Sequence, residues 1–126
     1  MFDRLKSMTA LAGLMQNRGK VQEAADRVKR ELAGVRVGGE AGGGAVRVVV
    51  AGDMTVIDVW LSPALAAGMA ASEPSRDYAQ TLIRDAVNAA QMKSREKMRE
   101  ILKREAEAMG LGDLAGEMGG LENLIR

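Results

Sequence analysis

The chain has 126 residues, a net charge of +1, and neither Cys nor His. Its length suits one domain, the lack of Cys excludes a disulfide framework, and the lack of His removes the usual general base and the commonest metal ligand. Glu40, Asp53 and Asp58 are scattered carboxylates, so we predict no enzyme activity and no cofactor. No apolar run approaches the roughly 18 residues of a membrane span and no signal peptide is visible, which predicts a cytoplasmic protein without a membrane partner.

Charge is distributed unevenly along the chain. Residues 1–33 hold seven basic and four acidic residues, and residues 76–104 hold eight and four. Residues 34–75 hold two basic and four acidic residues, and residues 105–126 hold one and five. The parts that read as helices are therefore basic, whereas the middle and the C-terminal segment are acidic.

The first predicted helix covers residues 3–33. Its second half carries an apolar stripe with helical spacing, formed by Val21, Ala25, Val28 and Leu32. A second stripe, from Leu5 to Met15, points roughly 140° away on a straight helix. We therefore expect a bend near Gly19, or a different partner for the first half, and a C-terminal cap at Gly34.

Blocks of β-branched residues punctuated by glycine fill Val35–Pro63, which is typical of short strands joined by tight turns. Strands are expected at residues 35–37, 45–50 and 55–61, and the short links favour an antiparallel meander over parallel crossovers. The link Gly38–Gly44 holds five glycines. A phosphate-binding loop would lead into a helix, but this link leads into a strand, so a flexible hairpin turn is the preferred interpretation.

Both faces of the predicted sheet are partly apolar. Alternation places three valines on one face of the second strand: Val46, Val48 and Val50. In the third strand it separates two sets, Ile57, Val59 and Leu61 from Val56, Asp58 and Trp60. Helices of the chain can cover one face, and a second subunit is the simplest cover for the other. Trp60 is then either an interface anchor or a half-buried residue.

A long helix is predicted from the cap signals at Ser72–Ser75 to about Met109, after a short Ala-rich turn of helix at residues 64–71. Its apolar stripe is nearly a heptad repeat: Ile83, Val87, Ala90, Ser94, Met98 and Ile101. A helix of about 34 residues is about 50 Å long. A compact domain of this size has a radius of gyration of only about 14 Å, so we expect the helix to project and its stripe to need a companion.

These elements predict an α+β fold of helix, three-stranded antiparallel meander and long helix, in a homodimer whose helices project as two arms. Residues 1–109 would form the domain and residues 110–126 a Gly-rich, acidic, flexible tail. Helical spacing persists in the tail from Leu111 to Ile125, but its five glycines each cost a helix about 1 kcal/mol. The tail is expected either to compete with DNA for the basic helix or to dock on the long helices.

The segment Gly39–Val48 resembles the Gly-Glu-Ser/Ala-Gly-x-Gly-x-Val-x-Val signature of the YbaB/EbfC nucleoid-associated family. Leu61–Leu65 continues the match, and Leu82–Ala90 resembles the family's Leu-x-x-x-Ala-x-Asn-x-Ala helix. The resemblance covers roughly residues 1–105 in the order helix, three strands, long helix. It implies a nucleoid-associated homodimer that grips duplex DNA between its arms, mainly by phosphate contacts with weak sequence preference, and affects chromosome organisation and gene expression.

Residues 93–104 hold six basic residues against Glu96 and Glu100. By residue pattern alone a solvated face laced by i, i+4 pairs is preferred over a phosphate-contacting stripe; the resemblance reverses that preference. The candidate DNA-binding residues are Lys93, Arg95, Lys97, Arg99, Lys103 and Arg104, with Arg4, Lys6, Arg27 and Arg30 on the first helix. The candidate dimer-interface residues are Trp60, Val56, Val87, Met98 and Ile101.

Two alternatives remain open, because the near-zero net charge and the acidic tail depart from a strongly basic architectural protein. One is a dimeric adaptor that binds other proteins without significant DNA binding. The other is a purely structural dimer.

Overall fold

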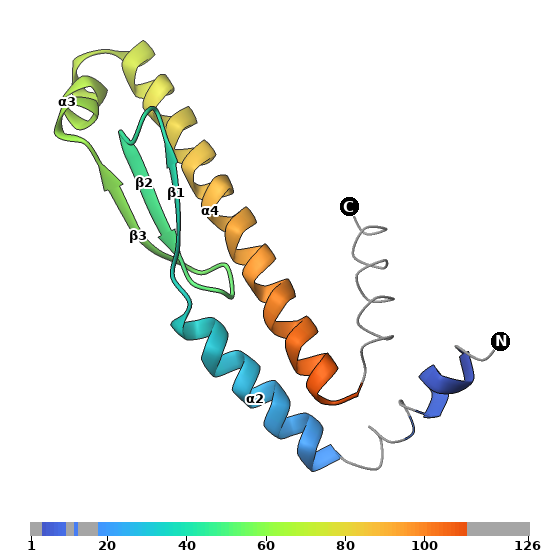
Figure 1. Cartoon of the computed structure of the whole chain (residues 1–126). Helices are drawn as coiled ribbons and strands as arrows, with labels where there is room; N and C mark the ends of the chain where they lie inside the picture. The colour runs from blue at the N-terminus through green and yellow to red at the C-terminus, as the bar shows by residue number, and fades with distance from the viewer. Residues whose placement is uncertain (1–3, 10–11, 13–17, 111–126) are drawn as a thin grey trace. The chain divides into compact units, whose positions relative to one another are not determined.

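The computed structural model describes residues 4–9, 12 and 18–110. Residues 4–9 are helical, and the elements that follow are α2 (Arg18–Gly34), β1 (Val37–Ala41), β2 (Val46–Val50), β3 (Val56–Leu61), α3 (Pro63–Ala71) and α4 (Glu73–Ala108) (Figure 1). This order confirms the predicted α+β fold. Gly19, the position of the expected bend, is helical, whereas residues 13–17 and the predicted tail from residue 111 onward lie outside the described residues.

The chain divides into two compact units, one formed by residues 31–98 and the other by residues 1–30 and 99–126. The first unit contains the sheet, α3 and most of α4. The second contains the first part of α2 and the last part of α4.

The sheet is an antiparallel meander in the order β1-β2-β3, as predicted. The first strand, however, was placed too early: β1 runs through Gly38 and Gly39, which pair with Val49 and Val48. The turn is thereby reduced to the residues after Ala41, where three consecutive glycines have φ of 64°, 68° and 92°. Backbone pairing to β2 keeps the first two glycines extended, and only the later ones supply the left-handed conformations that a tight turn requires.

The core of this unit lies between α4 and the first two strands (Figure 1). The three valines predicted to share a face of β2 are all fully buried. They pack with Leu82, Ala86 and Ala90 of α4. The predicted stripe on this helix was therefore slightly misplaced, since Leu82 and Ala86 are buried while Ile83 and Val87 are only half-buried.

Close approach of α4 to the sheet explains that shift. A Cβ built on Gly39 would meet the backbone nitrogen of Ala90 and would lie 2.5 Å from the carbonyl oxygen of Ala86. Only glycine on the strand and small side chains on the helix allow the two backbones to come this near. The helix therefore turns its alanines toward β1, which moves the larger Ile83 and Val87 to the margin.

The β2–β3 turn is clamped to α4 by a buried serine. Ser94 is fully buried, and its hydroxyl donates to the carbonyl oxygen of Ala51 at 2.6 Å and accepts from the amide of Met54 at 3.2 Å. The Gln91 amide adds a donor to the Met54 carbonyl oxygen at 3.3 Å. Met54 has a φ of 70°, and these bonds hold it in that uncommon conformation.

Both later helices begin at serine caps. The Ser62 hydroxyl accepts from the amide of Leu65 at the start of α3. The Ser72 hydroxyl accepts from the amide of Ser75 at the start of α4, as the cap signals predicted. Among the described residues, no helix combines the length and the apolar character needed to span a membrane.

The second unit is built on α2 residues up to 30 and α4 residues from 99. Among its described residues, the buried apolar ones are Ala24 and Ile101. The stripe predicted for α2 holds at its C-terminal end, where Leu32 is buried and Val28 half-buried. At the other end Ala24 is buried, whereas the predicted Val21 and Ala25 are exposed. The Arg27 guanidinium joins the two helices through Glu105, with Nη2 and Oε2 3.3 Å apart.

Candidate nucleic-acid interface

Basic side chains are concentrated in the last third of α4. In the unit of residues 31–98, Lys93 and Lys97 are exposed and Arg95 is half-buried. In the other unit, Arg99, Lys103 and Arg104 are exposed. Five of the six cationic candidates on α4 therefore face solvent, where a phosphate could reach them.

Three of these cations also interact within the chain, namely Lys97, Arg99 and Arg104, and so does Glu100 on the same helix. Interactions within the chain are compatible with the solvated-face interpretation. Exposed pairs of this kind are weak, worth about 0–1 kcal/mol, so a phosphate can compete for them. The two interpretations are therefore compatible in this structure.

The candidates near the N-terminus are less uniform. Arg27 forms an ion pair with Glu105, and its side chain remains 51% exposed. Arg30 is exposed, and so are Arg4 and Lys6 on the helical residues 4–9.

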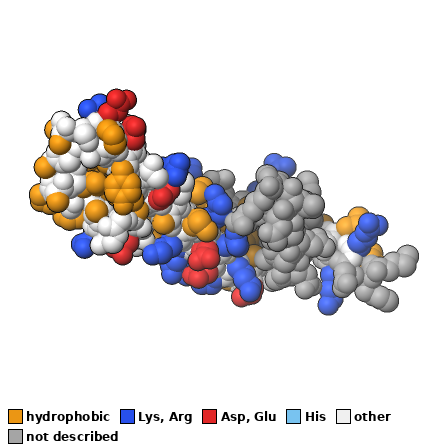
Figure 2. Space-filling view, turned by 90° about the horizontal axis from the view of Figure 1, so that it is seen from above, with side chains coloured by type: hydrophobic (Ala, Val, Ile, Leu, Met, Phe, Trp, Pro, Cys, Tyr) orange, Lys and Arg blue, Asp and Glu red, His pale blue; other side chains and the backbone are white. Residues whose placement is uncertain are grey.

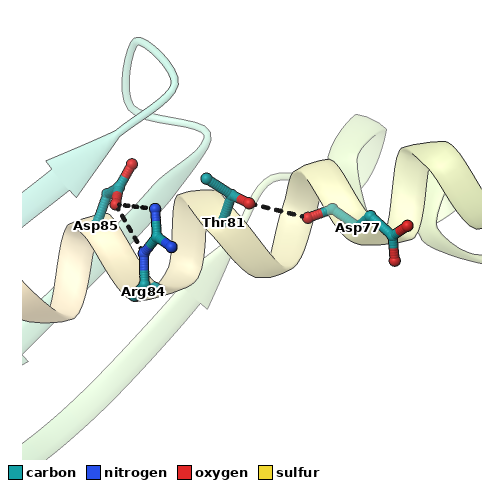
Figure 3. Close-up of polar contacts among 4 residues, drawn as sticks. All are labelled: Asp77, Thr81, Arg84 and Asp85. Atoms are coloured by element: carbon teal, nitrogen blue, oxygen red, sulfur yellow. Dashed lines mark hydrogen bonds and ion pairs between the residues drawn. The ribbon is translucent and has the colours of Figure 1, made fainter.

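The first half of α4 differs in charge. Residues 73–92 contain Arg76 and Arg84 against three acidic residues. Both Nε and Nη2 of Arg84 donate to Oδ1 of Asp85, at 3.2 and 3.1 Å, so this arginine is neutralised by its neighbour (Figure 3). One turn earlier, the Thr81 hydroxyl donates to the carbonyl oxygen of Asp77 at 3.2 Å (Figure 3). The excess of positive charge thus begins only at Lys93.

Surface composition agrees with this distribution. Hydrophobic side chains gather over the left of Figure 2, where Figure 1 places α3 and β3. In the middle of the view, Lys and Arg side chains are interspersed with Asp and Glu (Figure 2). Such a surface favours contacts to individual phosphates over one strong basic patch.

The candidate interface residues fall into two groups. Val56 and Trp60 on β3 are 42% and 45% exposed. Val87 and Met98 on α4 are half-buried, and Ile101 is 2% exposed within a single chain. Only the β3 residues are therefore presented by one chain as an accessible apolar surface.

Trp60 belongs to a row of side chains that crosses the outer face of the sheet. It lies opposite Arg47, which in turn lies opposite Glu40. The Arg47 guanidinium carbon is 5.2 Å from the centroid of the Trp60 ring, and its Nε is 4.0 Å from the Glu40 carboxylate. Sequence alternation indicates only that Arg47 lies on the face opposite the three valines, because this row depends on the register of two strand pairs.

Two of the three scattered carboxylates have polar partners, Glu40 beside Arg47 and Asp53 in a turn. Asp53 lies in the β2–β3 turn, where bonds from the side chain and the amide of Thr55 lower the pKa of its exposed carboxyl. An ionised Asp that accepts from the amide two residues on is a common turn device. Over the part of the chain that the structure describes, no group of three or more acidic side chains is placed to hold a metal ion.

Comparison with known proteins gives consistent matches. The profile of the YbaB/EbfC DNA-binding family matches residues 8–109. The chain is 36% identical over 98 residues to a nucleoid-associated protein of Nostoc punctiforme, covering 77% of this chain and 83% of the relative. It is 38% identical over 80 residues to a nucleoid-associated protein of Pseudomonas fluorescens, covering 64% and 70%.

Among solved structures, the crystal structure of an uncharacterized protein from Helicobacter pylori is similar. The TM-score is 0.53 at 14% sequence identity, over 67% of this chain and 92% of that chain. This similarity shows a shared fold.

Proposed function

The chain belongs to the YbaB/EbfC DNA-binding family, and on this basis we propose that it is a nucleoid-associated protein that binds duplex DNA as a homodimer. The observation that supports the DNA contact is the concentration of exposed cations from Lys93 to Arg104. Exposed Lys and Arg side chains on a helix bind phosphates and release counterions, which yields affinity with little sequence preference.

The proposed contact centres on one face of α4. At about 100° per residue, Lys93, Lys97 and Arg104 lie within about 40° of one another around the helix axis. Because the stripe also contains Glu96 and Glu100, we propose that each chain binds DNA weakly and that the dimer doubles the number of phosphate contacts.

Support for a homodimer comes from β3. Four of its apolar side chains are 42–47% exposed, on a strand that has a partner on only one side among the described residues: Val56, Ile57, Val59 and Trp60. Exposed apolar edge strands are a liability that proteins normally cover. Light scattering should give about 27 kDa, twice the 13.4 kDa of one chain. A 13.4 kDa species at tens of micromolar, roughly the upper limit for useful weak dimers, would contradict the proposal.

The DNA contact is tested by two charge-matched triple variants. The first replaces Lys93, Lys97 and Arg104 with Ala, and the control replaces Arg36, Arg76 and Arg84, which lie outside the candidate stripe. The first variant should bind duplex DNA more weakly and reduce the salt slope by roughly 1 for each phosphate that is no longer neutralised. The control removes the same charge and should keep most of the slope; equal reductions in both would attribute the binding to bulk charge rather than to the stripe.

A second function is favoured by α3. This helix contains no charged residue and buries none of its residues, so it presents an uncharged, Ala-rich surface. That surface suits an adaptor that binds another protein. Lack of DNA binding at low salt, with the dimer intact, would favour the adaptor.

A further inference from the structure

β3 forms one edge of the sheet, where another strand could pair with it. β3 pairs with β2 on one side, and no described strand pairs with its other side. Ile57, Val59 and Trp60 on this strand are 44–47% exposed, because the buried cluster formed with α4 includes β2 and not β3. The opposite edge, β1, has only Gly38, Gly39 and the charged Glu40 between its half-buried ends, so β3 is the edge that gains from being covered.

Backbone geometry shows which groups on β3 are available. The amide of Ser62 donates to the carbonyl oxygen of Ala45 at 2.8 Å, which extends the β2–β3 register by one pair. In an antiparallel ladder, residues alternate between bonding to the neighbouring strand and pointing to the other side. Trp60 and Asp58 therefore direct their amide and carbonyl groups toward β2, whereas Val59 and Leu61 direct theirs to the open edge.

The charged side chains on the outer face differ in whether they have a polar partner. Trp60 has Arg47 over its ring, and Arg47 remains 64% exposed beside Glu40. Asp58 lies opposite Val49, and its carboxylate makes no hydrogen bond or ion pair with the described residues. The edge strand thus carries an unpaired carboxylate at Asp58. Two residues further along, at Trp60, it carries the Arg47 guanidinium, which Glu40 neutralises only in part.

In a two-fold antiparallel pair of β3 edges, one residue of the strand lies opposite its own copy, and each side chain stays on its own face of the sheet. Near the middle of the strand this central residue can be Asp58, Val59 or Trp60. Centring on Asp58 would set two unpaired carboxylates directly opposite each other, which is destabilising. Centring on Trp60 would pair only the last residues of the strand, since α3 begins at Pro63. Centring on Val59 pairs most of the strand and sets Asp58 opposite Trp60.

Resting on the homodimer proposed above, we propose that its two chains pair through their β3 edges in a single register, with Val59 opposite Val59 of the partner subunit. Asp58 of the partner subunit then lies beside Trp60 and within reach of the Arg47 guanidinium, and the pair is repeated by symmetry. On the inner face, Ile57 then lies opposite Leu61 of the partner subunit, on either side of the central Val59 pair. Asp58 selects the register, because its carboxylate lies near the Arg47 guanidinium in this alignment. In the alignment centred on Asp58 it would instead lie opposite the same carboxylate of the partner subunit.

The chain contains no Cys, so single cysteines report the register directly. A disulfide forms only where the two Cα atoms lie about 4.4–6.8 Å apart. On oxidation, Val59→Cys should give a covalent dimer, whereas Asp58→Cys alone and Trp60→Cys alone should not. A mixture of Asp58→Cys and Trp60→Cys chains should give the mixed covalent dimer, which tests the same register without altering Val59.

Light scattering of wild type and of the reduced variants separates the two proposals. A monomeric wild type refutes the homodimer itself. A dimeric wild type in which Asp58→Cys or Trp60→Cys links to itself, or in which neither Val59→Cys nor the mixture links, leaves the homodimer standing and overturns the register.

The electrostatic part has its own test. Asp58→Arg sets two cations together in the proposed register and should raise the dimer dissociation constant by at least about tenfold. Asp77→Arg makes the same change of charge at an exposed position on α4 and should leave it within about twofold. Equal effects of the two substitutions would overturn the contact between Asp58 and Arg47.

Discussion

The packing of α4 on the sheet depends on Gly39, and Gly39→Ala measures how strictly. The added Cβ would lie 2.5 Å from the Ala86 carbonyl oxygen and 2.9 Å from the Ala90 Cα. Both are backbone atoms, which cannot rotate away as a side chain could. Ordinary contact begins at 3.4 Å, so strand and helix would have to separate by about 0.9 Å at this point.

That separation loosens the packing around fully buried valines. Overpacking of a core costs about 1–3 kcal/mol, and the lower entropy of unfolded alanine returns about 0.4–1 kcal/mol. We expect a net loss of about 1–2 kcal/mol, or roughly 4–10 °C in Tm.

The neighbouring Gly38→Ala is the matched control, since a Cβ there would be 3.8 Å from its nearest neighbour, the Val48 carbonyl oxygen. It should be neutral or slightly stabilising. Calorimetry of both variants at one protein concentration makes the comparison independent of dimer dissociation. Equal Tm values for the two variants would refute the close approach of α4 to β1.

Three further predictions concern stability. Ser94→Ala removes both bonds of the hydroxyl, while the Met54 amide keeps its 3.0 Å bond to the Ala51 carbonyl oxygen, so it should cost about 0.5–1.5 kcal/mol in chemical denaturation. A neutral result would mean that the turn is not held by this serine. Ile101→Ala should cost about 2–4 kcal/mol, and the exposed Leu102→Ala less than about 1 kcal/mol; similar losses would contradict the burial of Ile101. Asp53 has a lowered pKa in the folded chain, so its contribution is present above the unfolded pKa and is lost as pH falls through the folded one. Asp53→Asn should therefore lower Tm slightly at neutral pH and not in strong acid, and a difference that persists in acid would contradict the Thr55 bonds as its cause.

Local patterns predicted the elements well because each element has its own period. The order of helix, meander and long helix was read from glycines, β-branched runs and caps. Alternation alone placed the valines at 46, 48 and 50 on one common face, and the structure shows that this face is the buried one. The family resemblance rested on Gly39–Val48 and on Leu82–Ala90, and the profile match to residues 8–109 confirms it.

Features that depend on contacts between elements were not predictable in the same way. The length of β1 and the rotation of α4 both follow from the approach of Gly39 to Ala86 and Ala90, which no single segment reveals. Alternation also fails at Val56, because a register shift places it opposite Val50 rather than on the face of Asp58 and Trp60. The contact of Arg47 with Trp60 required the same register.

The central claim is that the chain binds duplex DNA mainly through phosphates, and the salt dependence of binding tests it most directly. Fluorescence anisotropy with two duplexes of equal length and unrelated sequence should give log K values that fall linearly with log salt, with a slope of about −0.9 for each phosphate neutralised. The account predicts steep and nearly equal slopes for the two duplexes. No binding at low salt, or binding that is insensitive to salt, would contradict it.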